Sequence, residues 1–147
     1  MKFPIAAAAA LAVLAAAPAS AGETPSAPGT EVYIVNLSDG DVVNGSVPVI
    51  FGLRGMGVAP AGVEAENTGH HHILLNRAPF GEGPEDAEYD EVGLPADDNH
   101  KHFGGGQTEA LLELPPGEHT LQLVFADHFH VPHDPPVMSE QITITVK

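Results

Sequence analysis

The sequence contains no cysteine and no tryptophan. The lack of cysteine excludes disulfide frameworks, thiolate zinc sites, iron–sulfur clusters and thiol catalysis. Basic residues are also scarce, because the 147 residues include 20 acidic residues and only 5 lysines and arginines. The resulting formal net charge of −15 argues against binding to the phosphate backbone of nucleic acids. It argues equally against docking on anionic lipid through a basic patch.

One long hydrophobic run is present, and it lies at the amino terminus. Lys2 precedes an apolar stretch over residues 5–17, and Ala19-Ser20-Ala21 follows. This order of charge, apolar core and small residues predicts a secretory signal peptide over residues 1–21, cleaved after Ala21. Because the apolar stretch is too short for a membrane-spanning helix, we expect a periplasmic or extracellular protein with no membrane span after leader removal.

The rest of the chain predicts an all-β domain. Residues 22–30 are polar and proline-rich, which is typical of a flexible lead-in. Beyond them, turn residues separate short runs of β-branched and alternating apolar residues, and no segment shows helical periodicity over three turns. These features predict one immunoglobulin-like β-sandwich of about seven short strands over residues 31–147. The predicted strands cover residues 31–37, 46–53, 70–76, 99–103, 107–114, 119–126 and 140–146.

Three connecting segments carry more specific predictions. Pro115-Pro116-Gly117-Glu118 is expected to join its two flanking strands as a hairpin. Residues 77–99 hold eight acidic residues with little apolar periodicity, so a long loop is expected there. The glycines of residues 104–106 lack the lysine and the helix of a phosphate-binding loop. A tight bend or a close backbone approach beside the histidines is the expected role.

Nine histidines are the unusual feature of this composition. Six of them form three H-x-H pairs: His70 with His72, His100 with His102, and His128 with His130. Residues two apart on a strand project from the same face, so each pair can point two imidazoles toward one ion. The alternating strand directions of an immunoglobulin-like sandwich predict that all three pairs gather at one end, with His119 at the other.

These pairs are the predicted metal ligands, and His71 and His133 are secondary candidates. In the strand 70–76, His71 shares its face with Ile73 and Leu75, and His70 and His72 share the other face. A donor set made only of nitrogen favours copper, with zinc or nickel as alternatives. Asp127 and Asp134 are candidates for orienting the imidazoles.

Four blocks of the sequence read Thr68-Gly69-His70-His71-His72, HKHFGGGQTE over residues 100–109, LPPGEHTLQL over residues 114–123 and HVPHDPPVMSE over residues 130–140. With these blocks the chain resembles a family of secreted, His-rich bacterial domains of unknown function. The resemblance covers nearly all of residues 31–147, and it implies a secreted single-domain protein without an established activity. Residues 38–47 resemble the opening of bacterial immunoglobulin-like modules, which agrees with the strand pattern.

Three functions fit these features. The first is a secreted or periplasmic protein that sequesters or transfers a metal ion, copper above all, and whose partners are the ion and another periplasmic protein. The second is an interaction module without metal, in which the histidines form a hydrogen-bond network or sense pH. The third is a metal-dependent enzyme, which the sequence supports least because it identifies neither a substrate pocket nor a general base.

Overall fold

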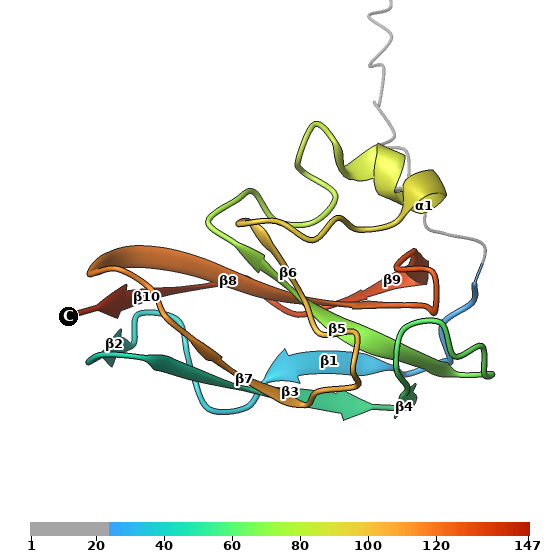
Figure 1. Ribbon diagram of the computed structural model, residues 1–147, viewed down its shortest axis with the longest axis horizontal. Coiled ribbons are helices and arrows are strands. Elements are labelled where there is room, and N and C mark those ends of the chain that lie inside the picture. Colours follow the sequence, from blue (N-terminus) through green and yellow to red (C-terminus); the bar gives the residue numbers. More distant parts are fainter. Residues whose placement is uncertain (1–23) are drawn as a thin grey trace, which may run out of the picture.

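Alternating apolar residues build two β-sheets that pack face to face (Figure 1). The structure is a computed structural model that describes residues 24–147, so the predicted signal peptide lies outside the described residues. The smaller sheet has the order β1-β3-β7 and is antiparallel. Its strands are β1 (Glu31–Ile34), β3 (Val47–Arg54) and β7 (Glu109–Leu112).

The larger sheet has the order β2-β10-β8-β5-β4, with β6 added to β5 and β9 added to β8. The long strand β8 pairs with β5 along one side and with β10 and then β9 along the other. Only the short strands β2 and β4 pair in parallel. The strands are β2 (Val42–Val43), β4 (Gly57–Val58), β5 (Thr68–Leu75), β6 (His100–His102), β8 (Gly117–Ala126), β9 (Pro132–Met138) and β10 (Ile142–Val146).

The predicted all-β sandwich is confirmed, and the strand order explains why it resembles an immunoglobulin domain. The first, second and fifth predicted strands form one sheet, and the third, sixth and seventh form the core of the other. The predicted hairpin at Pro115-Pro116-Gly117 is wrong, because β7 and β8 lie in different sheets and this connection crosses between the layers. Sequence reasoning also missed β9, whose three prolines limit it to an edge position beside β8.

Buried apolar side chains fill the space between the sheets. Val47, Val49 and Phe51 alternate along β3 and face Ile73 on β5 and Phe125 on β8. Burial of each such side chain contributes about 1.5–3 kcal/mol. The inner face of the larger sheet is therefore fixed by packing, which also fixes the direction of the side chains on its outer face.

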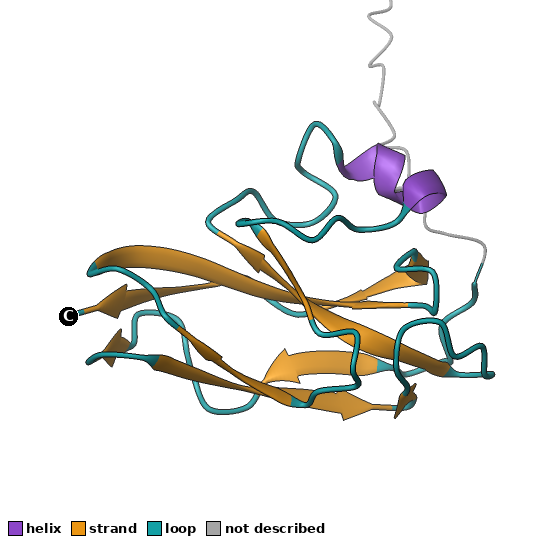
Figure 2. Cartoon of the chain, in the orientation of Figure 1, coloured by secondary structure: helices purple, strands orange, loops and turns teal. Residues whose placement is uncertain are grey.

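The outer face of the larger sheet is covered as well. Residues 77–99, predicted as a loop, also contain a 3₁₀ helix η1 (Asp86–Glu88) and one turn of helix α1 (Tyr89–Val92), which lie above β5 and β8 (Figure 2). A second buried cluster joins this segment to the sheet: Leu74, Phe80, Tyr89, Leu94, Val124 and Ala126. Within residues 24–147, no helix is long and apolar enough to cross a membrane.

Candidate metal centre

Strand β5 divides its three consecutive histidines between the two faces of the larger sheet. His71 points into the sandwich, where its ring lies 5.0 Å from the ring of Phe51 and 5.1 Å from that of Phe125, measured between centroids. His70 and His72 point to the outer face, and neither exposes any surface to solvent. This is the division that the strand parity predicts.

Four imidazoles from three elements meet on this outer face. His102 lies opposite His72 because β6 pairs with β5 in that register. His130 comes from the turn between β8 and β9. Measured between ring centroids, His70 lies 4.8 Å from His72, 5.1 Å from His102 and 5.0 Å from His130. His72 lies 5.1 Å from His102 and 5.9 Å from His130, and His102 lies 4.7 Å from His130. We call these four residues the histidine cluster.

Several ring nitrogens of the histidine cluster are unpaired within the described part of the chain. Nε2 of His72 lies 3.0 Å from Nε2 of His70, so the N–H of one ring donates a hydrogen bond to the unprotonated nitrogen of the other. Nδ1 of both residues and Nε2 of His102 are buried without a hydrogen-bond partner among the described residues. His70, His102 and His130 each offer one nitrogen, and these nitrogens lie within 4.8 Å of one another. A metal ion could therefore be held here.

The surroundings of His70, His72 and His102 favour the uncharged form of these imidazoles. Burial, helped by repulsion from His130 and His102, lowers the pKa of His70 to about 4. Burial also holds the pKa of His72 well below its usual value and lowers that of His102. Because a metal binds the unprotonated nitrogen, this environment favours the form of imidazole that coordinates metals.

A strained turn carries His130. Its φ angle of 70° lies in the left-handed region, which costs a residue other than glycine about 1–3 kcal/mol unless the surroundings enforce it. Oδ1 of Asp127 accepts hydrogen bonds from the backbone N–H groups of Phe129 and Val131, at 2.8 and 3.0 Å. Asp127 was predicted to orient an imidazole, and it contributes by shaping the turn without bonding to a ring.

The glycine-rich segment after β6 passes close to His102, as expected from the sequence. A Cβ atom placed on Gly104 would overlap the imidazole of His102 at Cε1 and Nε2. The carbonyl oxygen of Gly104 accepts a hydrogen bond of 2.8 Å from the N–H of Ala61, which fixes the segment. Only glycine leaves room for His102 to keep this orientation.

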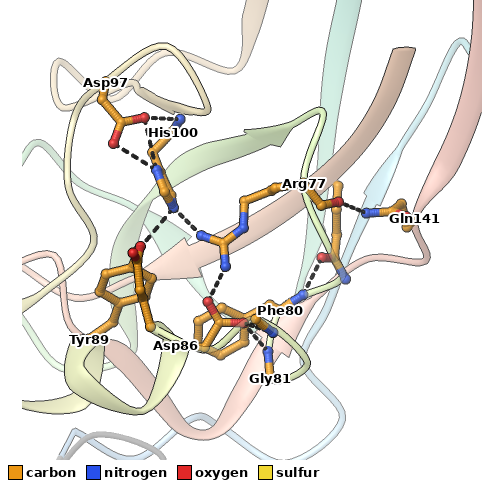
Figure 3. Close-up of polar contacts among 11 residues, drawn as sticks. Arg77, Phe80, Gly81, Asp86, Tyr89, Asp97, His100 and Gln141 are labelled. Atoms are coloured by element: carbon orange, nitrogen blue, oxygen red, sulfur yellow. Dashed lines mark hydrogen bonds and ion pairs between the residues drawn. The ribbon is translucent and has the colours of Figure 1, made fainter. Parts of the chain in front are cut away.

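His100 lies on the same face of β6 but belongs to a different network (Figure 3). Its Nδ1 donates to the Asp97 carboxylate at 2.9 Å, and its Nε2 faces the guanidinium of Arg77 and the hydroxyl of Tyr89. Arg77 also forms an ion pair with the buried carboxylate of Asp86. This network ties residues 77–99 to the sheet, and sequence reasoning gave no sign of the Arg77–Asp86 pair.

The other predicted ligands lie outside the histidine cluster. His128 packs against Phe129, with ring centroids 4.1 Å apart. His133 is fully buried, stacks on Phe125 and places Nδ1 3.2 Å from the backbone oxygen of that residue. His119 lies at the far end of β8, as predicted, and contacts the Asn76 amide and the oxygen of Pro115. The structure therefore gathers His70, His72, His102 and His130, and does not bring His71, His100, His128 or His133 to them.

Comparison with known proteins gives one match. A family model described as Domain of unknown function (DUF4399) matches residues 49–147, a range that contains all nine histidines. No curated protein and no solved structure matches the chain.

Proposed function

The chain belongs to the DUF4399 family of domains of unknown function, and we propose that it is a metal-binding protein that sequesters or transfers an ion held by His70, His72, His102 and His130. The observation that carries this proposal is the meeting of four imidazoles from three separate elements. A buried polar atom without a hydrogen bond costs about 1–3 kcal/mol. A bound ion would give a partner to Nε2 of His102, which has none among the described residues.

The donor set supports copper as the ion, with zinc or nickel as alternatives. Neutral nitrogen donors bind copper(II) most tightly among the divalent first-row metals, and zinc(II) and nickel(II) follow. The predicted signal peptide would deliver the protein to the periplasm or beyond. There, the strongly negative charge of the chain would draw cations toward its surface.

A shell of four protein ligands, made of the nitrogens of His70, His102 and His130 that lie within 4.8 Å of one another and a fourth from His72, would favour holding an ion over catalysis on it. Catalytic zinc sites keep one position open for water or substrate, whereas four ligands from the protein complete a tetrahedral shell. His102 and His130 are partly exposed and His70 and His72 are not. An ion would therefore enter and leave past His102 and His130, where another periplasmic protein could deliver or receive it.

One contact favours an alternative, an interaction module in which the histidines form a structural network. The hydrogen bond between His70 and His72 already pairs two of the ring nitrogens without metal. A sensor of pH near neutrality fits less well, because the pKa of His70 is about 4. In this alternative, excess copper or zinc leaves the melting temperature unchanged, since a ligand of the folded state must stabilise it.

Metal analysis of untagged protein, exported and purified without chelator, tests the proposal. We expect near-stoichiometric copper or zinc, or uptake of one equivalent on reconstitution. Replacement of both His70 and His72 by alanine should weaken binding by orders of magnitude, while His119→Ala should leave it unchanged. A metal-free protein that takes up neither ion, or equal losses in the double variant and in His119→Ala, would contradict the proposal.

A further inference from the structure

We infer that Thr24 and Asp127 are positioning residues for His130, so that the segment at the start of the described chain controls the affinity of the metal site. This inference rests on the proposed function. Thr24 and Asp127 are 103 residues apart in the sequence and joined by a hydrogen bond. The connection runs from Thr24 to the Asp127 carboxylate, from that carboxylate to the turn, and from the turn to His130.

The first step is the docking of residues 24–26 on β9. The backbone N–H of Asp134 donates to the oxygen of Thr24, and the N–H of Ser26 donates to the oxygen of Asp134, each at 2.9 Å. Pro25 pairs with Asp134 as a parallel bridge. Residues 22–30 were expected to be a flexible lead-in, yet this part of them is held by backbone hydrogen bonds beside the turn.

The second step is the carboxylate of Asp127, which divides its two oxygens between the segment and the turn. Oδ2 accepts a hydrogen bond of 2.6 Å from the Thr24 hydroxyl. Oδ1 accepts the N–H groups of Phe129 and Val131. Asp127 is only 4% exposed, so among residues 24–147 Thr24 is the group that satisfies its second oxygen.

The third step is the conformation of His130. The backbone N–H of His130 donates to the backbone oxygen of Asp127 at 3.0 Å. The backbone oxygen of His130 accepts a hydrogen bond of 2.8 Å from the N–H of Leu94. Left-handed backbone at a histidine persists only while such contacts enforce it. If Asp127 loses Thr24, its carboxylate is free to rotate, the N–H groups of the turn lose their acceptor, and the His130 ring can leave its position 4.7 Å from His102.

Thr24→Val tests the inference because it removes the hydroxyl and keeps the shape of the side chain. With zinc(II) alone as the probe, we expect a dissociation constant about 10-fold to 100-fold higher than that of the unmodified protein, the range typical of outer partners of metal ligands. Thr24→Ser keeps the hydroxyl and should therefore bind zinc(II) as tightly as the unmodified protein. Thr30→Val is the matched control, because the Thr30 hydroxyl bonds within the same segment, to the oxygen of Ala27 at 2.6 Å.

A second readout separates this inference from the proposed function. In metal-free protein, Thr24→Val should accelerate hydrogen exchange at the amides of Phe129 and Val131, while Thr30→Val should not. If the unmodified protein binds no zinc or copper, the proposed function fails, and exchange still reports whether Thr24 holds the turn. Unchanged zinc affinity with unchanged exchange in Thr24→Val, or equal effects in Thr30→Val, would overturn the inference.

Discussion

His100 and His102 project from the same face of β6, yet their surroundings differ. The ring nitrogens of His100 meet the Asp97 carboxylate, the Arg77 guanidinium and the Tyr89 hydroxyl. The ring of His102 faces other imidazoles, and its buried Nε2 has no partner among the described residues. Spacing of two places both histidines on one face, and the neighbouring residues decide which of them is free to bind an ion.

The same contrast separates the region around Arg77 and Asp86 from the region around His70 and His72. Around Arg77 and Asp86, each charge meets an opposite charge or a hydrogen bond, as a buried ion pair requires. Around His70 and His72, polar atoms are buried beside other imidazole rings and have no hydrogen-bond partner among the described residues. The first region is a completed structural network, and the second has the unpaired donor atoms of a binding site.

The largest expected effect comes from exchanging the two histidines of β6 for alanine, one at a time. His102→Ala should raise the dissociation constant for zinc or copper by at least about 100-fold, because loss of a ligand should exceed the 10-fold to 100-fold cost of losing an outer partner. His100→Ala should leave that constant within a few-fold and lower the stability by about 1–3 kcal/mol, because buried partners lose their hydrogen bonds. Metal titration and thermal melting of both variants measure these effects. The comparison fails if His100→Ala weakens binding as much as His102→Ala does.

A smaller effect is expected from Gly104→Ala. The added methyl group would overlap the imidazole of His102 and push it out of the cluster, so we expect about 10-fold weaker metal binding with little change in melting temperature. Gly105→Ala is the matched control, because its methyl group would meet the flexible end of Gln107 at 3.1 Å. Similar affinities for the two variants would show that the Gly104 position does not orient His102.

A third expected effect is a pH dependence of the metal-free protein. The pKa of His71, like that of His70, falls from 6.5 to about 4 on folding, with burial as the main cause. Between pH 6.5 and 4 the unfolded chain binds more protons than the folded chain, so the free energy of unfolding decreases as the pH falls through this window. His71→Phe should make this decrease shallower, since the ring between Phe51 and Phe125 no longer titrates.

The region around His100 should behave differently over that pH range. Burial opposes ionisation of Asp97, but the hydrogen bonds from the His100 ring and from the backbone N–H groups of Asn99 and His100 together outweigh it and lower the pKa of this carboxyl below 3.8. The stabilisation from ionised Asp97 is therefore present above pH 3.8 and is lost only at lower pH. Denaturant unfolding curves of the unmodified protein and of His71→Phe at pH 7, 5.5 and 4.5 check the first expectation, and a further curve below pH 3.8 checks the second. A free energy of unfolding that is flat over this range, or equally steep in His71→Phe, would contradict the first.

Most of the fold follows from the apolar pattern of the sequence. The alternation of Val47, Val49 and Phe51 and of Ile142, Ile144 and Val146 marks two strands, and their order gives the sandwich. The pattern failed at β9, because its prolines remove the strand signal while an edge position still accepts them. It failed at Pro115-Pro116, because a turn sequence does not say whether the next strand joins the same sheet or the facing one.

The candidate site could be predicted only in part. Strand parity separates His71 from its neighbours, and the glycines after His102 signal a close approach. In the other two H-x-H pairs, His100 with His102 and His128 with His130, residues that are distant in the sequence decide which member joins the cluster. His100 is paired by Arg77 and Tyr89, and His130 is turned toward the cluster by a strained backbone that Asp127 enforces. Such contacts are set by the tertiary structure, and the local sequence does not contain them.

The most direct test of the account is a zinc(II) titration followed through the imidazole ¹⁵N resonances of all nine histidines. The account predicts that one equivalent of zinc shifts the ring resonances of His70, His72, His102 and His130 together and leaves those of His100 and His119 in place. Absence of any shift at one equivalent would contradict a metal site. Shifts centred on His100, His128 or His133 would contradict the assignment of its ligands.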